Sequence, residues 1–483
     1  MKSEKNIPLK LALLPLIFLV ILLTINVYVF GNDALGGSNQ FILLIGGVFA
    51  AIIGFSLKVS YKEMVSSVGE NLKSVTGAIL ILLFVGALAG TWLLSGIIPA
   101  MIYYGIQILH PSYFFVACII IAALISIATG SSWTTSATVG IALIGIGKTM
   151  GLDSGMIAGA VISGAYFGDK MSPLSDTTNL AAAMSGSNLF NHIKYMTITT
   201  FPSIVITILF FGIVGFFQSY AAITQTDTLL NSISEKFSVT PLLFIVPAVV
   251  IFMIAKKTPP LVALIIGTLL GGLFAFIFQN ELLFTLNNYE ILSWKNSYRI
   301  LLDNITSSTV IETSNPILNE LFISGGMKGM LDTIWLIICA MVFGGIMDSI
   351  GALKSISNSL LLWAKNTFQL FLSTVASCLT INITASDQYL SLVVPGKMFE
   401  KAYKKRGLAP ENLSRTLEDS GTVTSVLIPW NTCGAYQSGV LGVPVVEYFI
   451  FAIFNWISPL TTVSYTHLRA NETGRYGVWR LQV

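Results

Sequence analysis

The sequence predicts an all-α polytopic membrane protein built from two inverted structural repeats, with re-entrant hairpins and discontinuous helices. Of the 483 residues, 54% are hydrophobic and 10% are charged, whereas soluble proteins carry about 25% charged residues. Several apolar segments are too short to cross a bilayer alone, and they flank polar, glycine-rich clusters. Irregular backbone inside a membrane is tolerated only beside protein or a water-filled cavity. Finally, the two halves of the chain come into register at a fixed offset.

The remaining composition argues against other classes of protein. The 26 basic and 23 acidic residues give a net charge of +3, so no nucleic-acid partner is expected. The three histidines lie far apart, and no metal centre or cofactor is predicted. The four cysteines lie in apolar stretches without paired spacing, and we interpret them as reduced core residues: Cys118, Cys339, Cys378 and Cys433.

The first apolar run, residues 11–30, is predicted to be a retained helix. It is long enough for a bilayer core of about 30 Å, and no small-residue cleavage site follows it. Further apolar segments lie at about 41–57, 76–98, 113–128, 136–147, 155–168, 196–217, 240–255, 261–278, 332–352, 367–383, 420–429 and 439–460. The predicted organisation is a first transmembrane repeat at 1–217, a linker at 218–240, and a second repeat at 241–461 with an extramembrane insert at about 280–328.

Basic residues predict the orientation, because short cytoplasmic loops are rich in lysine and arginine. One such loop carries Lys58, Lys62 and Lys73, and another carries Lys397, Lys401, Lys404, Lys405, Arg406 and Arg415. Residues 31–40 contain no basic side chain and are expected outside. The chain is therefore predicted to cross the inner (cytoplasmic) membrane several times, with its N-terminus in the cytoplasm.

An offset of 255 residues relates the two halves. It places these residues in pairs: Gly90 on Gly345, Gly96 on Gly351, Thr129 on Thr384, Ser131 on Ser386, Val139 on Val394, Asp176 on Asn431 and Thr177 on Thr432. Two membrane segments can share glycines by chance. Here, however, both polar clusters of the first half coincide with polar clusters of the second, as expected for duplicated transporter halves that meet near the bilayer midplane.

The first polar cluster, residues 129–136, is rich in hydroxyl groups. Its side chains can replace part of the water shell of an ion, or they can simply bond to carbonyl groups one helical turn earlier. The pairing with the second half favours a site. The candidate lining residues here are Ser131, Ser132, Thr134 and Thr135.

The second cluster, residues 164–179, contains two carboxylates and a helix breaker, Pro173. A charged side chain at the bilayer centre costs about 2.5–3.5 kcal/mol on insertion scales, so its default interpretation is functional. For Asp169 the alternative is an ion pair with Lys170. Asp176 has no neighbouring base, which favours it as an ion ligand.

The second half contributes matching polar breaks. Glu418 and Asp419 follow a basic loop and have an interfacial position as the alternative. Asp348 is an isolated carboxylate in an apolar segment, and it either binds a proton or caps a helix. The predicted ion or proton ligands are Asp169, Asp176, Thr177, Asn179, Asp387, Asn431 and Thr432, with Asp176, Thr177 and Asn431 assigned to Na⁺. The other lining candidates are Thr384, Ser386, Asp419 and Thr422.

Buried carboxylates of this kind can bind either a cation or a proton, so rocking between two states would exchange Na⁺ for H⁺. A carrier of small carboxylates or amino acids is the alternative, since helix N-termini and hydroxyl groups also suit anions. No arginine precedes Arg299 and none lies in the polar clusters, which favours a cation. A membrane enzyme would need a nucleophile–base pair or a metal constellation, and no histidine lies near any cluster.

With these motifs in view, the sequence resembles the NhaC-type sodium/proton antiporter family of the ion-transporter superfamily. The resemblance covers about residues 8–460 and rests on four motifs, at residues 130–136, 164–179, 385–389 and 418–433. It implies a bacterial cytoplasmic-membrane antiporter with inverted repeats, acting on Na⁺ and H⁺ in the lipid bilayer. Similar carriers exchange malate with protons for lactate with sodium, so a small organic anion stays open as a partner, as does a homodimer.

The end of the chain departs from that pattern. Hydrophobicity stops near residue 460, and residues 463–473 look like the translation of a transposon adapter used in sequencing libraries. We therefore expect 462–483 to be a non-native tail, and the alternative is a genuine short polar tail.

Overall fold

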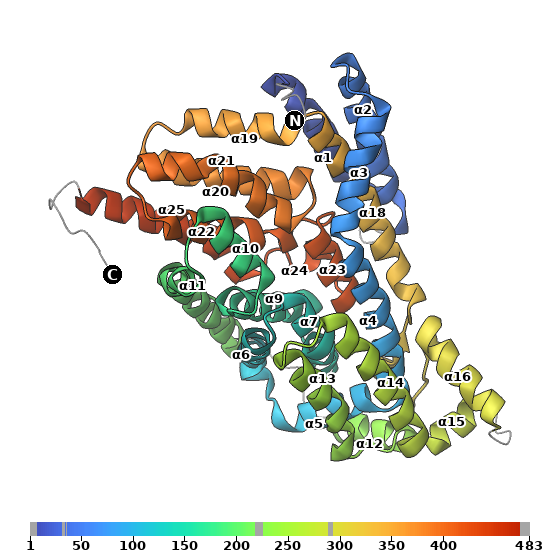
Figure 1. Cartoon of the computed structure of the whole chain (residues 1–483). Helices are drawn as coiled ribbons and strands as arrows, with labels where there is room; N and C mark the ends of the chain where they lie inside the picture. The colour runs from blue at the N-terminus through green and yellow to red at the C-terminus, as the bar shows by residue number, and fades with distance from the viewer. Residues whose placement is uncertain (1–6, 31–33, 35, 218–225, 288–292, 474–483) are drawn as a thin grey trace.

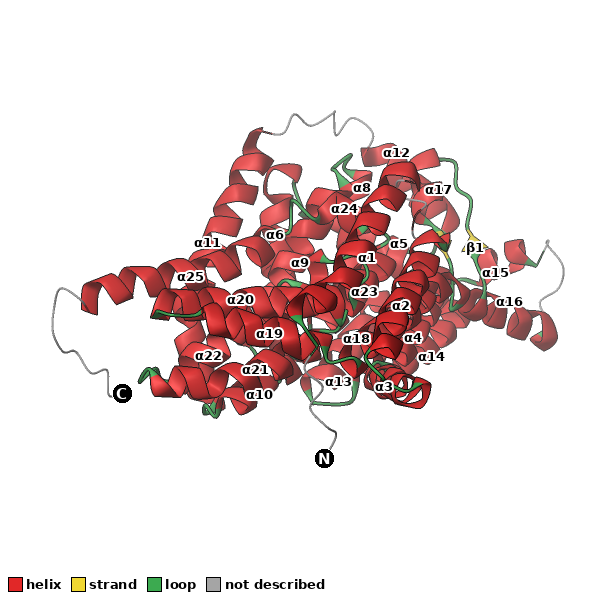
Figure 2. Cartoon of the chain, turned by 90° about the horizontal axis from the view of Figure 1, so that it is seen from above, coloured by secondary structure: helices red, strands yellow, loops and turns green. Residues whose placement is uncertain are grey.

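The computed structural model describes residues 7–30, 34, 36–217, 226–287 and 293–473. The gaps fall at the N-terminus, in the 31–40 loop, in the 218–240 linker, in the 280–328 insert and in the tail. Figures 1 and 2 show a helical protein. In the described residues the strands are β1 (Thr309–Val310) and β2 (Ile323–Ser324), which pair antiparallel within the insert.

Eight described helices are long and apolar enough to cross a membrane, which confirms the all-α membrane class. They are α1 (Leu9–Phe30), α2 (Ser38–Ser56), α4 (Thr76–Leu94), α6 (Pro111–Thr129), α11 (Leu189–Phe217), α14 (Pro260–Phe278), α18 (Leu331–Ser349) and α20 (Thr367–Thr384). A ninth span results if α12 (Thr226–Lys236) and α13 (Ile245–Ala255), which are bent by 81° against each other, count as one. Helix α12 lies within the predicted 218–240 linker.

The other helices are shorter or amphipathic. In the first half they are α3 (Tyr61–Ser74), α5 (Ile97–Ile108), α7 (Ser132–Thr135), the π-turn η2 (Ser136–Gly140), α8 (Ile141–Thr149), α9 (Ser154–Met171) and α10 (Asp176–Ser185). In the second half they are η4 (Pro241–Phe244), α15 (Asn280–Leu286), α16 (Trp294–Thr306), α17 (Pro316–Leu321), η5 (Lys328–Met330), α19 (Ala352–Trp363), α21 (Gln388–Lys405), α22 (Pro410–Leu417), the π-turn η6 (Glu418–Thr422), the 3₁₀ turn η7 (Ser425–Leu427), α23 (Thr432–Leu441), α24 (Val445–Tyr448) and α25 (Ile453–Thr473).

The segments predicted as basic loops contain helices. Helix α3 carries Lys62 and Lys73 and begins with a capping box, in which the Ser60 hydroxyl accepts from the Glu63 amide and the Glu63 carboxylate accepts from the Ser60 amide. Helix α21 carries the lysines from 397 to 405. Both were missed because an amphipathic helix contains no long apolar run.

The helix bounds repeat at the offset found in the sequence. Adding 255 to the bounds of α4 and α5 gives the bounds of α18 and α19, and α6 and α10 fall within one residue of α20 and α23. Helix α4 packs on α14, as α18 packs on α2. In Figure 1, α2, α4 and α18 run steeply on one side of the molecule, while α19, α20 and α21 cross the other.

Two glycine pairs explain part of this agreement. Gly96 and Gly351 precede α5 and α19 with φ of 76° and 77°, a left-handed backbone that favours glycine. Gly90 and Gly345 allow neighbouring backbone to approach. A Cβ at Gly90 would lie 2.0 Å from the Asn304 carbonyl oxygen, and one at Gly345 would lie 2.7 Å from the Val68 Cα.

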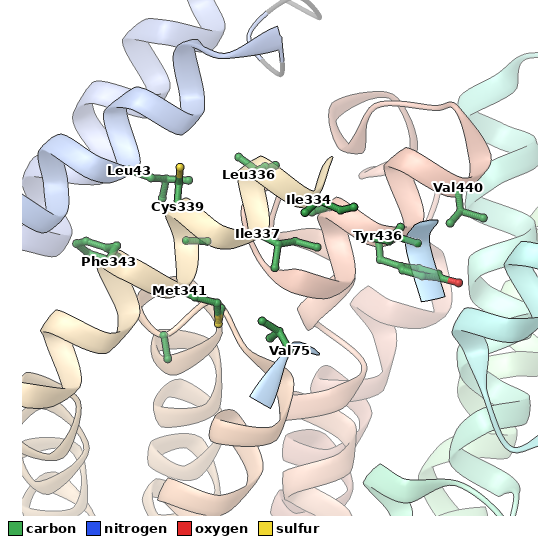
Figure 3. Close-up of a cluster of buried hydrophobic side chains, with 14 of the residues drawn as sticks. Leu43, Val75, Ile334, Leu336, Ile337, Cys339, Met341, Phe343, Tyr436 and Val440 are labelled. Atoms are coloured by element: carbon green, nitrogen blue, oxygen red, sulfur yellow. The ribbon is translucent and has the colours of Figure 1, made fainter. Parts of the chain in front are cut away.

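One of the hydrophobic cores lies around α18. Phe343 and Cys339 face Leu43 of α2, while Ile334 and Ile337 lie toward Tyr436 of α23 (Figure 3). Helix α18 therefore connects the steep helices to the broken segments that carry the polar clusters.

Candidate ion-binding cavity

A cavity of about 560 Å³ lies between the two halves. Some of the residues predicted to bind an ion or to line its site do line this cavity: Ser131, Thr134, Asp169, Asp176, Asp387 and Thr432. Three carboxylates thus share one cavity: Asp169 and Asp176 from either side of the break between α9 and α10, and Asp387 from the break before α21. Gln388, Tyr389 and Lys257 also line it, and they were not among the predicted site residues.

Asp176 lies where α9 and α10 are interrupted. Pro173 falls in the break between the two helices, and the Ser175 hydroxyl caps α10 by accepting from the Thr178 amide. The Tyr389 hydroxyl donates to Asp176 Oδ2 at 2.5 Å, and the Thr177 amide donates to Oδ1 at 2.9 Å. The carboxylate therefore links α10 of the first half to α21 of the second.

Asp169 is held by the hydroxyl cluster. Its Oδ2 accepts from the Ser132 amide at 3.0 Å and from the Ser132 hydroxyl at 2.7 Å. Its Oδ1 has no hydrogen-bond partner among the described residues. An ion pair with Lys170 is not formed, because the Lys170 ammonium points to the other side of α9 and contacts Asp419.

Asp387 caps α21 and accepts from the Leu390 amide at 2.8 Å, with 1% of its surface exposed. The preceding Ser386 has a φ of 59°, which is uncommon for a residue other than glycine. Its carbonyl oxygen accepts from the Thr432 amide at 2.9 Å. This bond joins the break before α21 to the break before α23.

The other predicted residues lie outside the cavity lining: Ser132, Thr135, Thr177, Asn179, Thr384, Ser386, Asp419, Thr422 and Asn431. Several stabilise the breaks instead. The Asn179 amide donates to the Pro173 and Ser175 carbonyls at 3.0 and 2.6 Å. The Asn431 amide donates to the Asn382 carbonyl at 3.0 Å.

Asp348 is exposed, because α18 ends one residue later at Ser349 and Asp348 falls in its last turn. It accepts from the Ser67 hydroxyl at 3.4 Å. The structure thus places it at a helix end rather than inside an apolar span.

Glu418 and Asp419 are fully buried within the protein, so neither carboxylate is exposed on the molecular surface. Asp419 contacts Lys170 and accepts from the hydroxyls of Thr199 at 2.8 Å and Ser458 at 2.9 Å. Both carboxylates lie in η6, where a polar π-turn is surrounded by other helices.

Arg415 is the functional candidate that sequence reasoning missed. It was assigned to a cytoplasmic loop, but it lies on α22, fully buried, with its guanidinium 5.0 Å from the centre of the Tyr195 ring. Its position three residues before Glu418 was the available signal. An arginine therefore does lie beside a polar cluster.

Two stacked aromatic rings lie at the wall of the cavity. Trp133, which lines the cavity, stacks on Tyr436 with 4.0 Å between ring centres and 17° between planes. The Tyr436 hydroxyl donates to the Trp133 carbonyl at 3.1 Å. A second cavity of about 240 Å³ is lined by residues next to Tyr436 in the chain, such as Ala435 and Ser438, and by Thr333 of α18.

Residues 164–468 match the Na⁺/H⁺ antiporter family. The chain is 35% identical to the Na⁺/H⁺ antiporter NhaC of Alkalihalophilus pseudofirmus, over 87% of this chain and 88% of the relative. It is 34% identical to the malate-2H⁺/Na⁺-lactate antiporter of Bacillus subtilis over 91% of this chain and 90% of the relative. It is 31% identical to the arginine/ornithine antiporter ArcD of Halobacterium salinarum over 95% and 92%. The chain is therefore a member of the Na⁺/H⁺ antiporter family.

Proposed function

We propose that this protein exchanges Na⁺ for H⁺ across the cytoplasmic membrane by alternating access, using the cavity carboxylates to hold either ion. The observation that carries the proposal is the shared cavity, in which Asp169, Asp176 and Asp387 meet. Asp176 and Asp387 stand at breaks between helices, and Asp169 lies in the last turn before one of them. Interrupted membrane helices place carboxylates and free backbone groups where carriers bind their ions. The name of the relative from Alkalihalophilus pseudofirmus supports the same ions.

We further propose that residues 1–217 and 241–461 are inverted repeats. The equal bounds of α4 and α18, and of α5 and α19, at one offset support this. The second cavity supports it as well, since Asp332, Thr333 and Leu336 in its lining fall at the offset positions of Gly77, Ala78 and Ile81 in the first. In this proposal the second cavity marks the path on the opposite side of the membrane.

The first cavity is proposed to open to the cytoplasm. Its lining includes Ser74, which follows Lys73, and Lys257, which follows Lys256. Two basic segments at one rim support a cytoplasmic mouth. With the N-terminus also in the cytoplasm, the structure would represent an inward-open state, closed on the outer side by Trp133 and Tyr436.

A second candidate is exchange of a small carboxylate or amino acid coupled to Na⁺ and H⁺. Two observations favour it: a cavity of about 560 Å³ has room for more than a bare ion, and Lys257 places a cation in its wall. The names of the Bacillus subtilis and Halobacterium salinarum relatives fit this reading.

The test uses the full chain in proteoliposomes that contain a pH-sensitive dye. An outward Na⁺ gradient should acidify the interior in the wild type, and Asp176→Asn should abolish the signal. Asp303→Asn, an exposed carboxylate on α16, is the matched control and should behave as wild type. Wild-type exchange by Asp176→Asn would contradict the cavity mechanism. The assay is then repeated with malate, lactate and arginine, and a proton flux that depends on one of them would select the second candidate.

A further inference from the structure

Glu418 is a buried carboxylate that does not line the cavity. It is fully buried in η6. Its Oε1 accepts from the Thr178 hydroxyl at 3.2 Å, which joins it to α10 of the first half. Its Oε2 has no hydrogen-bond partner in the described parts of the chain. A buried carboxylate oxygen without a partner is costly, so such an atom calls for a ligand.

Other buried oxygens near Glu418 also lack a hydrogen-bond partner among the described residues. The Thr422 hydroxyl, one turn further along η6, lies beside the Glu418 carboxylate. Its oxygen has no hydrogen-bond partner among the described residues. Asp169 lies near enough to act electrostatically on Glu418, and its Oδ1 is also without a partner. Buried oxygens from both halves without a hydrogen-bond partner are thus found in the neighbourhood of Glu418.

The backbone at this place is unwound. The Val423 amide bonds to the Glu418 carbonyl, five residues back, which makes η6 a π-turn. Single π-turns within helices are frequent at functional sites. In carriers, unwound backbone supplies carbonyl ligands for Na⁺.

The local charge also calls for a cation. Lys170 contacts Asp419 and acts electrostatically on Glu418, and the buried guanidinium of Arg415 acts electrostatically on Lys170. Two buried cations thus accompany the two buried carboxylates Glu418 and Asp419. Asp169 adds a third carboxylate on the cavity side. Charges buried in a membrane protein are normally balanced by a partner.

We infer that Glu418, Thr422 and Asp169 form a second Na⁺ site behind the cavity, separate from the one at Asp176. This inference rests on the proposed Na⁺ exchange and adds a second cation position to it. Asp169 lies between the two positions, since it lines the cavity and also neighbours Glu418. Through Asp169, Na⁺ could pass between the cavity and the second Na⁺ site.

The experiment measures equilibrium binding of radiolabelled Na⁺ to the purified full chain at alkaline pH. The wild type should bind two ions per chain, and Glu418→Gln should bind one. Thr422→Val, which removes only a hydroxyl, should keep both sites and weaken one of them about tenfold. Glu411→Gln is the matched control, because it lies on α22, outside the site, where it accepts from the Ser187 hydroxyl. It should bind two ions.

The outcomes separate this inference from the proposed function. Wild-type stoichiometry and affinity in Glu418→Gln would overturn the second site, whatever Asp176→Asn does. If Glu418→Gln does not fold, unchanged affinities in Thr422→Val overturn it instead. Loss of one ion in Glu418→Gln together with normal binding in Asp176→Asn would support the second site while removing the cavity site. A wild type that binds no Na⁺ would refute both.

Discussion

Removal of the Lys170 side chain is expected to weaken the fold strongly. Its ammonium contacts Asp419, and both side chains are fully buried. Breaking a buried ion pair by removing one partner costs about 3–5 kcal/mol. Lys170→Met leaves both Asp419 and Glu418 without an ammonium, so we expect a loss of about 5 kcal/mol in the free energy of unfolding. Asp419→Asn leaves Lys170 beside Glu418 and the Ser458 hydroxyl, so we expect a loss of about 3 kcal/mol.

The double variant provides the sharper test. Lys170→Met combined with Asp419→Asn contains one unpaired carboxylate instead of two, so it should be more stable than Lys170→Met alone by about 0.5–3 kcal/mol. The measurement is unfolding in mixed micelles at increasing SDS, followed by the fluorescence of the eight tryptophans. Lys256→Met, an exposed lysine after α13, is the control and should change little. A double variant that is less stable than Lys170→Met would refute the reasoning.

Two further predictions concern the closed side of the cavity and the helix contacts. Trp133→Ala removes the ring that stacks on Tyr436. We test it with Ser438→Cys in a chain without native cysteines: in the Trp133→Ala variant this cysteine should react about tenfold faster with an external, membrane-impermeant thiol reagent than in the parent that keeps Trp133. Equal rates would mean that the stack is not a barrier. Gly345→Ala places a methyl group against the Val68 backbone and should destabilise the protein by about 1–3 kcal/mol. Gly69→Ala, where nothing lies within 4 Å, should be neutral or stabilising in the same unfolding assay, and equal effects at both positions would contradict the packing argument.

Hydropathy and the internal offset predicted much of the architecture. Segments such as 76–98 and 261–278 correspond to α4 and α14, because a long apolar run in a membrane protein has few alternatives to a helix. The amphipathic helices α3 and α21 were missed, because their lysines interrupt any apolar run.

The sequence predicted which carboxylates lie together, but not every partner of the charged side chains. The sequence indicated that Asp169, Asp176 and Asp387 belong together, since the polar breaks of the two duplicated halves were expected to meet near the bilayer midplane. All three line one cavity. It did not indicate the partner of Lys170. Its neighbour in sequence, Asp169, points toward the cavity, while Asp419 is 249 positions away in the chain. Such a pairing depends on how α9 packs against η6, and local sequence carries no record of it.

The left-handed backbone at Ser386 has a mechanical consequence. A conformation of this kind costs about 1–3 kcal/mol outside glycine, and it persists only where its surroundings enforce it. Here the carbonyl oxygen of Ser386 accepts a hydrogen bond from the Thr432 amide. The segments that begin at Asp387 and Thr432 are thus fastened to each other, and any movement that carries ions across the bilayer should displace them as one rigid unit. Distances between their side chains would then stay constant through the cycle, while distances to Asp176 change.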